Sequence, residues 1–322
     1  MERYKSLDSL RGIAALFVLF SHYTYLYDVI YGYKFDYLNL KYLGGVAVQI
    51  FFILSGFLIY YSIIKSNSGI EFLKKRFIRL YPSYWTCLTI TFVTVFIFGL
   101  PTLQVSFRDA LFGLTMLPQL FGALKVDNSY WTLVPEFFFY VMMYVLFVSK
   151  KVDKIHWLAP TWLLLSLFHI HVYHLKGIGL LLNLDYSPCF LAGILVQNLK
   201  DNHKQYLLWI YFLLCFLLRI SLDDFDIYSS ISTFFVFSLF IVFVFSELTF
   251  LQNKVFLYFG VISYPLYLIH QNIGFIIINY TVKYFDNLLV IVLPTLVSIG
   301  LATIITLCIE KPAMAYLRNK LL

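Results

Sequence analysis

The sequence has little charge. Only 13% of its 322 residues are charged and 61% are hydrophobic, whereas soluble domains carry roughly 25% charged residues. A water-soluble fold could not cover this much apolar surface, so lipid is expected to be the solvent for most of the chain. This composition excludes an ordinary soluble enzyme.

Cysteine is also scarce, and the few cysteines do not pair in the sequence. No Cys-x-x-Cys motif is present, and each cysteine lies inside an apolar run, where it commonly behaves as a small hydrophobic residue. The sequence therefore predicts neither a disulfide framework nor a zinc site, and no metal is expected. The cysteines are Cys87, Cys189, Cys215 and Cys308.

Apolar stretches long enough to cross a bilayer recur along the chain, since a transmembrane helix needs about 20 such residues. They predict an all-α fold, a polytopic transmembrane helical bundle of about ten spans. With no repeat or long linker, residues 1–322 are expected to form a single integral membrane domain with no appended soluble domain. The expected spans cover residues 8–27, 43–64, 82–100, 130–148, 156–173, 177–197, 206–221, 228–246, 256–279 and 287–309.

The basic residues are distributed unevenly between the loops on the two sides. Ten spans place both termini on one side, and a cytoplasmic N-terminus divides the 24 Lys and Arg residues 17 inside to 7 outside. Such an excess is typical of cytoplasmic loops. The distribution predicts that both termini are cytoplasmic, and it explains the net charge of +7 without a nucleic-acid partner.

Three ionisable groups inside the expected spans are candidates for catalysis, because intramembrane ionisable groups are costly and often functional. His22 and His270 each lie about 14 residues from the cytoplasmic start of a span, hence about 21 Å deep. Glu136 lies about 9 Å from the outer end of a core about 30 Å thick, and Pro135 directly before it predicts a kink in the span. Two imidazoles and a carboxylate at similar depth suit general acid–base catalysis. The alternative for each is a structural bond to a neighbouring helix.

Arginines at the cytoplasmic ends of spans one and three are candidates for binding a phosphorylated donor. Arg76 and Arg79 share a helical face at i, i+3, and guanidinium groups bind phosphate well; simple membrane anchoring is the alternative. Arg11 shares a face with Asp8, with which local pairing is the alternative role, and with His22, which lies about 16 Å further along the axis. That distance suits a donor with an extended, flexible arm.

Two further sets of polar residues are candidates for function. Ser263, Tyr267 and His270 are spaced i, i+4, i+7 on span nine, where they could hold an acceptor or an oxyanion, or form an interhelical hydrogen-bonded seam. Three histidines in the expected hairpin between spans five and six are interpreted as a solvated loop rather than as a metal site. They are His169, His171 and His174.

Six segments, in order along almost the whole chain, resemble the acyltransferase family 3 membrane proteins, which include bacterial polysaccharide O-acetyltransferases. In WTLVPEFFFY, Trp131 and Glu136 match the family's pattern, whereas Phe137 and Phe138 replace its second Glu and its Gln. The other segments are Arg11 with His22 (Arg-x10-His), FFILSGFLI at 51–59, Arg76 with Arg79 (Arg-x-x-Arg), SYPLYLIH and the IEKPA segment at Glu310, Lys311 and Pro312.

The resemblance implies an O-acyltransferase of the bacterial inner membrane. It would move an acyl group, expected to be acetyl, from cytoplasmic acyl-CoA to a hydroxyl of a cell-envelope glycan such as lipopolysaccharide O-antigen, capsule or exopolysaccharide. The expected partners are the lipid bilayer and the glycan acceptor. The expected roles are catalysis by His22, Glu136 and His270, donor binding by Arg11, Arg76 and Arg79, and substrate binding by Trp131, Ser263 and Tyr267.

The main alternative is a lipid-linked glycan transporter or flippase that carries out no acyl transfer. Its pathway would be lined by intramembrane His, Arg and Glu, but broken helices in matched halves would be expected, and the sequence has no repeat. A glycan polymerase would need large extracytoplasmic loops, whereas the longest expected outer loop, about 101–129, is modest. A membrane sensor or interaction protein would not explain ionisable groups at matched depth.

Overall fold

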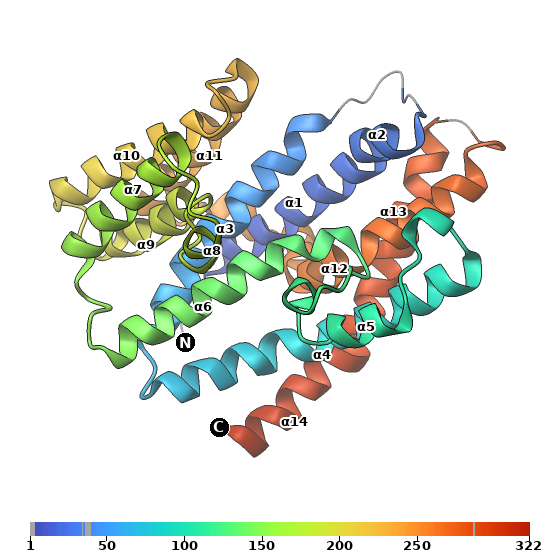
Figure 1. Cartoon of the computed structure of the whole chain (residues 1–322), viewed down its shortest axis with the longest axis horizontal. Coiled ribbons are helices and arrows are strands. Elements are labelled where there is room, and N and C mark those ends of the chain that lie inside the picture. The colour runs from blue at the N-terminus through green and yellow to red at the C-terminus, as the bar shows by residue number, and fades with distance from the viewer. Residues whose placement is uncertain (1–3, 34, 36–39, 286) are drawn as a thin grey trace. The chain divides into compact units, whose positions relative to one another are not determined.

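The computed structural model in Figure 1 is built from helices. It describes residues 4–33, 35, 40–285 and 287–322, and no strand occurs among them. The prediction of an all-α fold is therefore confirmed. Seven helical stretches are long and apolar enough to cross a membrane: Lys5–Tyr31, Lys41–Ile64, Gly69–Phe98, Asn128–Val148, Ile227–Phe245, Lys254–Thr281 and Leu288–Leu321.

The three remaining expected spans overlap shorter helices. They are α7 (Ile155–His171), α9 (Ser187–Asp201) and α10 (Tyr206–Ser221). The span expected at 177–197 is divided by a turn between α8 (Lys176–Leu181) and α9. Every expected span thus overlaps a helix, and seven of the ten reach full transmembrane length.

The other helical elements in chain order are α1 (Lys5–Ser21), the π-helix η1 (His22–Leu26), α2 (Tyr27–Tyr31), α3 (Lys41–Ile64), α4 (Gly69–Phe98), η2 (Pro101–Leu103), α5 (Phe107–Gly113), η3 (Pro118–Phe121), η4 (Asn128–Thr132), α6 (Leu133–Val148), α8 (Lys176–Leu181), α11 (Ile227–Phe245), η5 (Thr249–Gln252), α12 (Lys254–Thr281), α13 (Asn287–Ile305), the π-helix η6 (Thr306–Glu310) and α14 (Lys311–Leu321).

The chain forms two compact units. The first unit comprises Met1–Arg11, Gly45–Leu73 and Pro135–Asn253, and the second comprises Gly12–Gly44, Lys74–Val134 and Lys254–Leu322. The expectation that both work as a single acyltransferase domain stays a prediction.

In the first unit, α9 packs against α7, α10 and α11, which lie side by side in Figure 1. The backbone of α9 also touches that of α3. A Cβ atom on Gly56 would lie 2.0 Å from the Phe190 carbonyl oxygen, and one on Gly193 would lie 2.0 Å from that of Ile53. Glycine at both positions therefore permits this close helix packing, as small residues do in membrane proteins.

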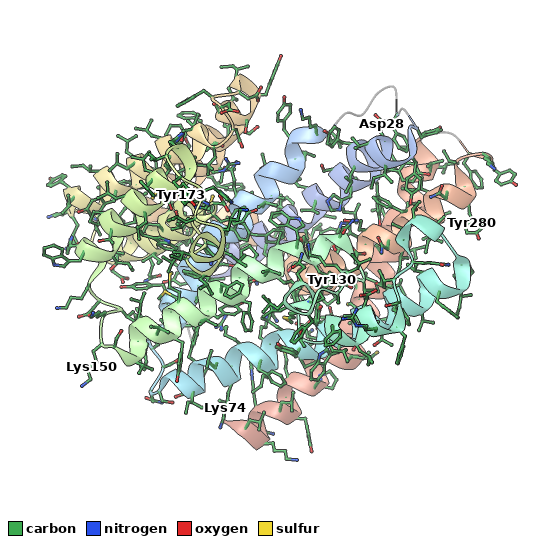
Figure 2. The ribbon with its side chains drawn as sticks, in the orientation of Figure 1. Asp28, Lys74, Tyr130, Lys150, Tyr173 and Tyr280 are labelled. Atoms are coloured by element: carbon green, nitrogen blue, oxygen red, sulfur yellow. The ribbon has the colours of Figure 1, made fainter. Side chains whose placement is uncertain are left out.

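The second unit is built around α12, which packs along α13. In the most apolar segment of α12, 83% of the residues are buried. In the corresponding segments of the other six long stretches, at most half of the residues are buried. Its backbone also touches α1, because a Cβ atom on Gly12 would lie 2.5 Å from the Gly260 nitrogen. Tyr130 of η4, labelled in Figure 2, packs against Tyr84 of α4 with ring centroids 5.4 Å apart.

Pro135 does not kink a transmembrane helix, contrary to what its position in the expected span 130–148 suggested. The structure begins α6 at Leu133, so the proline lies in the first turn. The first four N–H groups of a helix have no partner within it, and a proline there therefore costs no hydrogen bond.

Replacing Gly12 by Val should destabilise the protein, because the side chain must push the backbones of α1 and α12 apart. Overpacking of this kind costs about 1–3 kcal/mol, which should lower the Tm of the purified protein in detergent. Gly300→Val is the matched control, since no atom lies within 4 Å of a Cβ atom built at Gly300. Equal Tm values for the two variants would contradict the proposed tight contact.

Candidate active site

Two imidazoles that the sequence placed at equal depth meet in the second unit. His22 is the first residue of η1, and His270 lies on α12. The distance from His22 Nδ1 to His270 Nε2 is 2.9 Å, and the rings are stacked with centroids 5.0 Å apart. His270 is fully buried, whereas His22 is partly exposed. His22 is therefore the member of the pair that a substrate can reach.

The neighbouring carbonyl determines the tautomer of both histidines. His270 Nδ1 lies 2.8 Å from the Tyr267 carbonyl oxygen, which can only accept a hydrogen bond. Neutral His270 therefore carries its proton on Nδ1 and accepts at Nε2, so the proton of His22 must lie on Nδ1. His22 Nε2 is left with a free lone pair, which is what a general base or a nucleophile requires.

The start of a π-helix at His22 is a further structural signal. π-Helical turns are rare and are frequently found at functional sites. A second such turn in the described part of the chain, η6, ends at Glu310. Neither π-helical turn was predicted from the sequence.

Tyr23 holds the His270 backbone in place. Its hydroxyl donates to the His270 carbonyl oxygen at 2.8 Å, so the Ser298 hydroxyl, 2.9 Å away, must donate to Tyr23. The tyrosine ring fills the space beside Gly274, where a Cβ atom would lie only 2.1 Å from it. The residue after His22 thus fixes the helix that carries His270.

The predicted substrate residues of span nine form hydrogen bonds within the second unit. The Tyr267 hydroxyl donates to the Ser129 carbonyl oxygen at 2.6 Å and accepts from the Thr132 hydroxyl at 2.7 Å, which ties α12 to η4. Ser263 donates to the Gly260 carbonyl oxygen of its own helix at 2.9 Å. Trp131 is a partly exposed residue of η4.

Asp127 is a residue that the sequence interpretation missed. Its buried carboxyl accepts from the backbone N–H groups of Ser129 (2.8 Å) and Asn272 (3.1 Å), and the Asn272 amide donates to the Val126 carbonyl oxygen. These bonds anchor the loop before η4 to α12, two residues beyond His270. Burial raises the pKa of Asp127 to about 6.

Glu136 belongs to the first unit, where the structure places it at the start of α6. Its carboxylate accepts a hydrogen bond from the Ser55 hydroxyl of α3 at 3.2 Å and another from the Tyr140 hydroxyl one turn further along α6. Ser55 precedes Gly56, so the packing of α3 against α9 positions this donor. The expected meeting of Glu136 with the two imidazoles stays a prediction.

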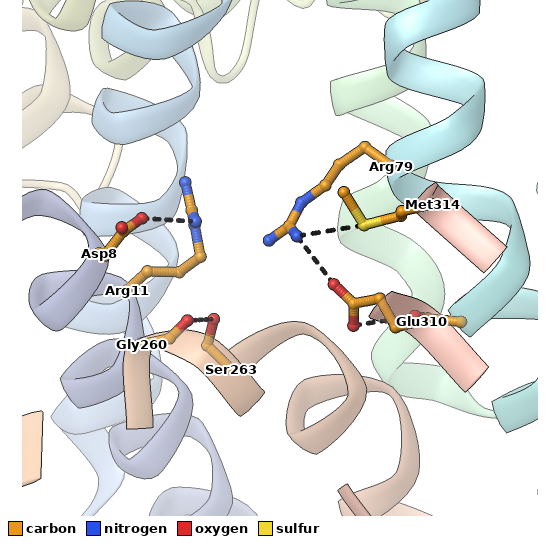
Figure 3. A network of polar contacts seen from close by, with 8 residues as sticks. Asp8, Arg11, Arg79, Gly260, Ser263, Glu310 and Met314 are labelled. Atoms are coloured by element: carbon orange, nitrogen blue, oxygen red, sulfur yellow. Dashed lines mark hydrogen bonds and ion pairs between the residues drawn. The ribbon is translucent and has the colours of Figure 1, made fainter. Parts of the chain in front are cut away.

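Two of the three predicted donor-binding arginines, Arg11 and Arg79, have acidic neighbours, which are drawn in Figure 3. Arg11 pairs with Asp8 at 3.4 Å in the first unit, as their i, i+3 spacing suggested. Arg79, in the second unit, donates to the Glu310 carboxylate at 2.8 Å. Arg76 lies one turn before Arg79 on α4.

The Glu310 carboxylate is buried and accepts hydrogen bonds from two side chains. Its other oxygen accepts from the Ser83 hydroxyl at 3.0 Å, so this carboxylate joins the end of η6 to α4. The sequence signal was a lone acidic residue at the C-terminal end of the last expected span, followed directly by Lys311.

The three histidines at the end of α7 and in the segment after it are not all exposed to solvent. His169 is 1% exposed, which corrects the expected solvated loop, and its ligand atoms lie within 4.8 Å of those of His174 and Asp185. The Leu175 N–H donates to His169 Nδ1, so Nε2 carries the proton and donates to Asp185 at 3.2 Å. With this tautomer His169 has no lone pair for a metal ion.

Long apolar helices and a pair of hydrogen-bonded imidazoles define a multi-pass membrane protein with a candidate acid–base centre. The sequence matches the family described as "Acyltransferase domain" over residues 4–309, nearly the whole chain, and the chain belongs to this family. No solved structure matches it.

Three curated relatives illustrate the similarity. The O-acetyl transferase of Shigella phage Sf6 is 38% identical over 31% of this chain and 28% of its own. Acyltransferase MdmB of Streptomyces mycarofaciens is 30% identical over 49% of this chain and 43% of its own. Nodulation protein 10 of Rhizobium leguminosarum bv. viciae is 29% identical over 43% of this chain and 42% of its own. The matched stretch thus spans less than half of each of these relatives.

Asp127→Asn should change how stability depends on pH. The native pKa of about 6 lies above the ordinary 3.8, so this carboxyl contributes stability at low pH that is lost as pH rises through 6. The free energy of unfolding of the variant, relative to that of wild type, should therefore rise by about 1 kcal/mol between pH 5 and pH 7.

The measurement is the Tm of both proteins in detergent across that pH range. Asp224→Asn, at an exposed turn with positive φ, is the matched control. A Tm difference between Asp127→Asn and wild type that stays constant with pH would refute a buried, titrating Asp127.

Proposed function

We propose that the protein is an O-acyltransferase that moves an acyl group, acetyl by preference, from acyl-CoA to a hydroxyl of a cell-envelope glycan. The observation that carries the proposal is the partly exposed His22. Its Nε2 lone pair is free because its Nδ1–H donates a hydrogen bond to His270 Nε2. Membership of the acyltransferase family supports the reaction type.

In the proposed step, His22 Nε2 removes the proton of the acceptor hydroxyl while the hydroxyl oxygen attacks the thioester carbonyl carbon. The carbon–sulfur bond then breaks, and the thiolate takes the proton from His22, which gives the acyl ester and free thiol. During the step His22 is an imidazolium whose Nδ1–H points at His270 Nε2, so the buried imidazole stabilises the charge as a triad's third member does.

The same lone pair would also support a covalent route, in which His22 accepts the acyl group before the glycan does. The two routes differ in one observable. Labelled acetyl-CoA without acceptor would leave label on the protein only in the covalent route.

The other candidate residues are assigned roles by their chemistry. We propose that Glu136 orients or charges an imidazole, that Trp131, Ser263 and Tyr267 contact the acceptor, and that Arg11, Arg76 and Arg79 bind the donor's phosphates. The excess of Lys and Arg on one side supports an inner-membrane protein with both termini in the cytoplasm. The donor would then enter from the cytoplasm and the acceptor from the opposite side.

His22→Ala should reduce acetylation by about 10²–10⁴-fold, the usual contribution of a positioned general base. Glycan extracted from cells that express each variant at equal membrane abundance would be analysed by mass spectrometry for added acetyl groups. His156→Ala, at an exposed position on α7, is the control and should acetylate normally. Wild-type acetylation by His22→Ala would remove the core of the mechanism and favour a transporter.

Glu136→Gln should lower kcat by about 10²-fold or more if the negative charge supports an imidazole, since a neutral amide cannot stabilise an imidazolium. The KM for the donor should not change. Ser55→Ala is the control, because it removes one hydrogen bond to Glu136 but keeps the charge. If Glu136→Gln and Ser55→Ala lose equally little activity, Glu136 is structural.

A further inference from the structure

A pocket of about 220 Å³ in the second unit contains the Arg79–Glu310 ion pair. A water molecule occupies roughly 30 Å³ of liquid, so the pocket has room for a polyatomic group. Figure 3 shows the Arg79 guanidinium directed at the Glu310 carboxylate and at the Met314 sulfur. The polar residues that line the pocket are Arg79, Thr306, Glu310, Lys311 and Arg318.

The lining of this pocket carries more positive than negative charge. Three cations face a single carboxylate, Glu310, whose side chain is 3% exposed and is already bonded to Arg79 and Ser83. The Arg79 side chain remains 33% exposed. Lys311 and Arg318 are both exposed and are spaced i, i+7, which places them on one face of α14. This charge distribution favours an anion.

A buried hydroxyl in the same lining has no hydrogen-bond partner among the described residues. Thr306 is 1% exposed and lines the pocket, and its Oγ1 forms no hydrogen bond with any residue that the structure describes. A buried donor without an acceptor is unfavourable, and a rotation of the Thr306 side chain toward the pocket would let it donate to a ligand oxygen. Thr306 is also the first residue of η6.

We infer that this pocket binds a phosphate group, with Lys311 and Arg318 supplying charge at the rim, Thr306 donating a hydrogen bond, and Arg79 shared between the ligand and Glu310. Glu310 then serves to keep Arg79 in position when the pocket is empty. The inference rests on the proposed function in taking the acyl donor as the source of the phosphate. A phospholipid headgroup presents the same chemistry.

The test is direct binding to the purified full-length protein in detergent, measured by calorimetry with three probes. They are coenzyme A, pantetheine, which lacks every phosphate, and a short-chain phosphatidic acid. The variants are Lys311→Gln with Arg318→Gln, Thr306→Val and its conservative partner Thr306→Ser. Lys320→Gln, a basic residue of α14 that does not line the pocket, is the control.

The double variant should bind coenzyme A at least about tenfold more weakly, the effect of losing one charge-assisted hydrogen bond. Pantetheine binding should not change. Thr306→Val should weaken coenzyme A binding, while Thr306→Ser and Lys320→Gln should not. If the loss affects only phosphatidic acid, the phosphate comes from lipid; unchanged affinity for both phosphorylated probes in a variant with wild-type Tm would overturn the inference.

This experiment does not depend on turnover. If wild-type protein transfers no acetyl group but loses phosphate binding in the double variant, the proposed function fails and the pocket stands. If acetylation depends on His22 but the double variant binds coenzyme A normally, the pocket assignment fails and the proposed function stands.

Discussion

The close contact between α1 and α12 is the constraint on which the candidate site depends. The backbones touch at Gly12 and Gly260, and each helix carries its histidine ten residues further along. Both helices rise about 1.5 Å per residue and run from this contact toward the histidine pair. The two imidazoles therefore lie at the same axial distance from the contact and can meet. Any side chain at Gly12 would disturb the geometry on which the His22–His270 hydrogen bond depends.

Much of the fold could be predicted from the sequence, because a bilayer permits few solutions for a long apolar chain. Each expected span overlaps a helix, although the span expected at 177–197 is broken by a turn, and equal depth correctly suggested that His22 and His270 could meet. Both spans were expected to run outward from the cytoplasm, so counting residues was enough to compare their depths. Local pairing of Asp8 with Arg11 followed in the same way from helical spacing.

The remaining features depend on tertiary contacts that a single sequence does not encode locally. Asp127 shows its role only when the loop before η4 meets α12. Arg79 pairs with Glu310, which lies 231 residues away, so the spacing of Arg76 and Arg79 gave no indication of it. Pro135 was expected to kink a helix because the start of the span was placed a few residues too early. The π-helical turns at His22 and Glu310 have no sequence signature.

The peptide carbonyl that anchors the imidazole pair has an energetic consequence. Soluble hydrolases commonly orient a catalytic histidine with a buried aspartate, but an isolated anion in a low-dielectric interior carries a large desolvation penalty. Tyr267 instead offers a permanent dipole that needs no counter-ion and cannot titrate. The resting pair is therefore electrically neutral, and a unit charge arises on it only while a proton is in transit.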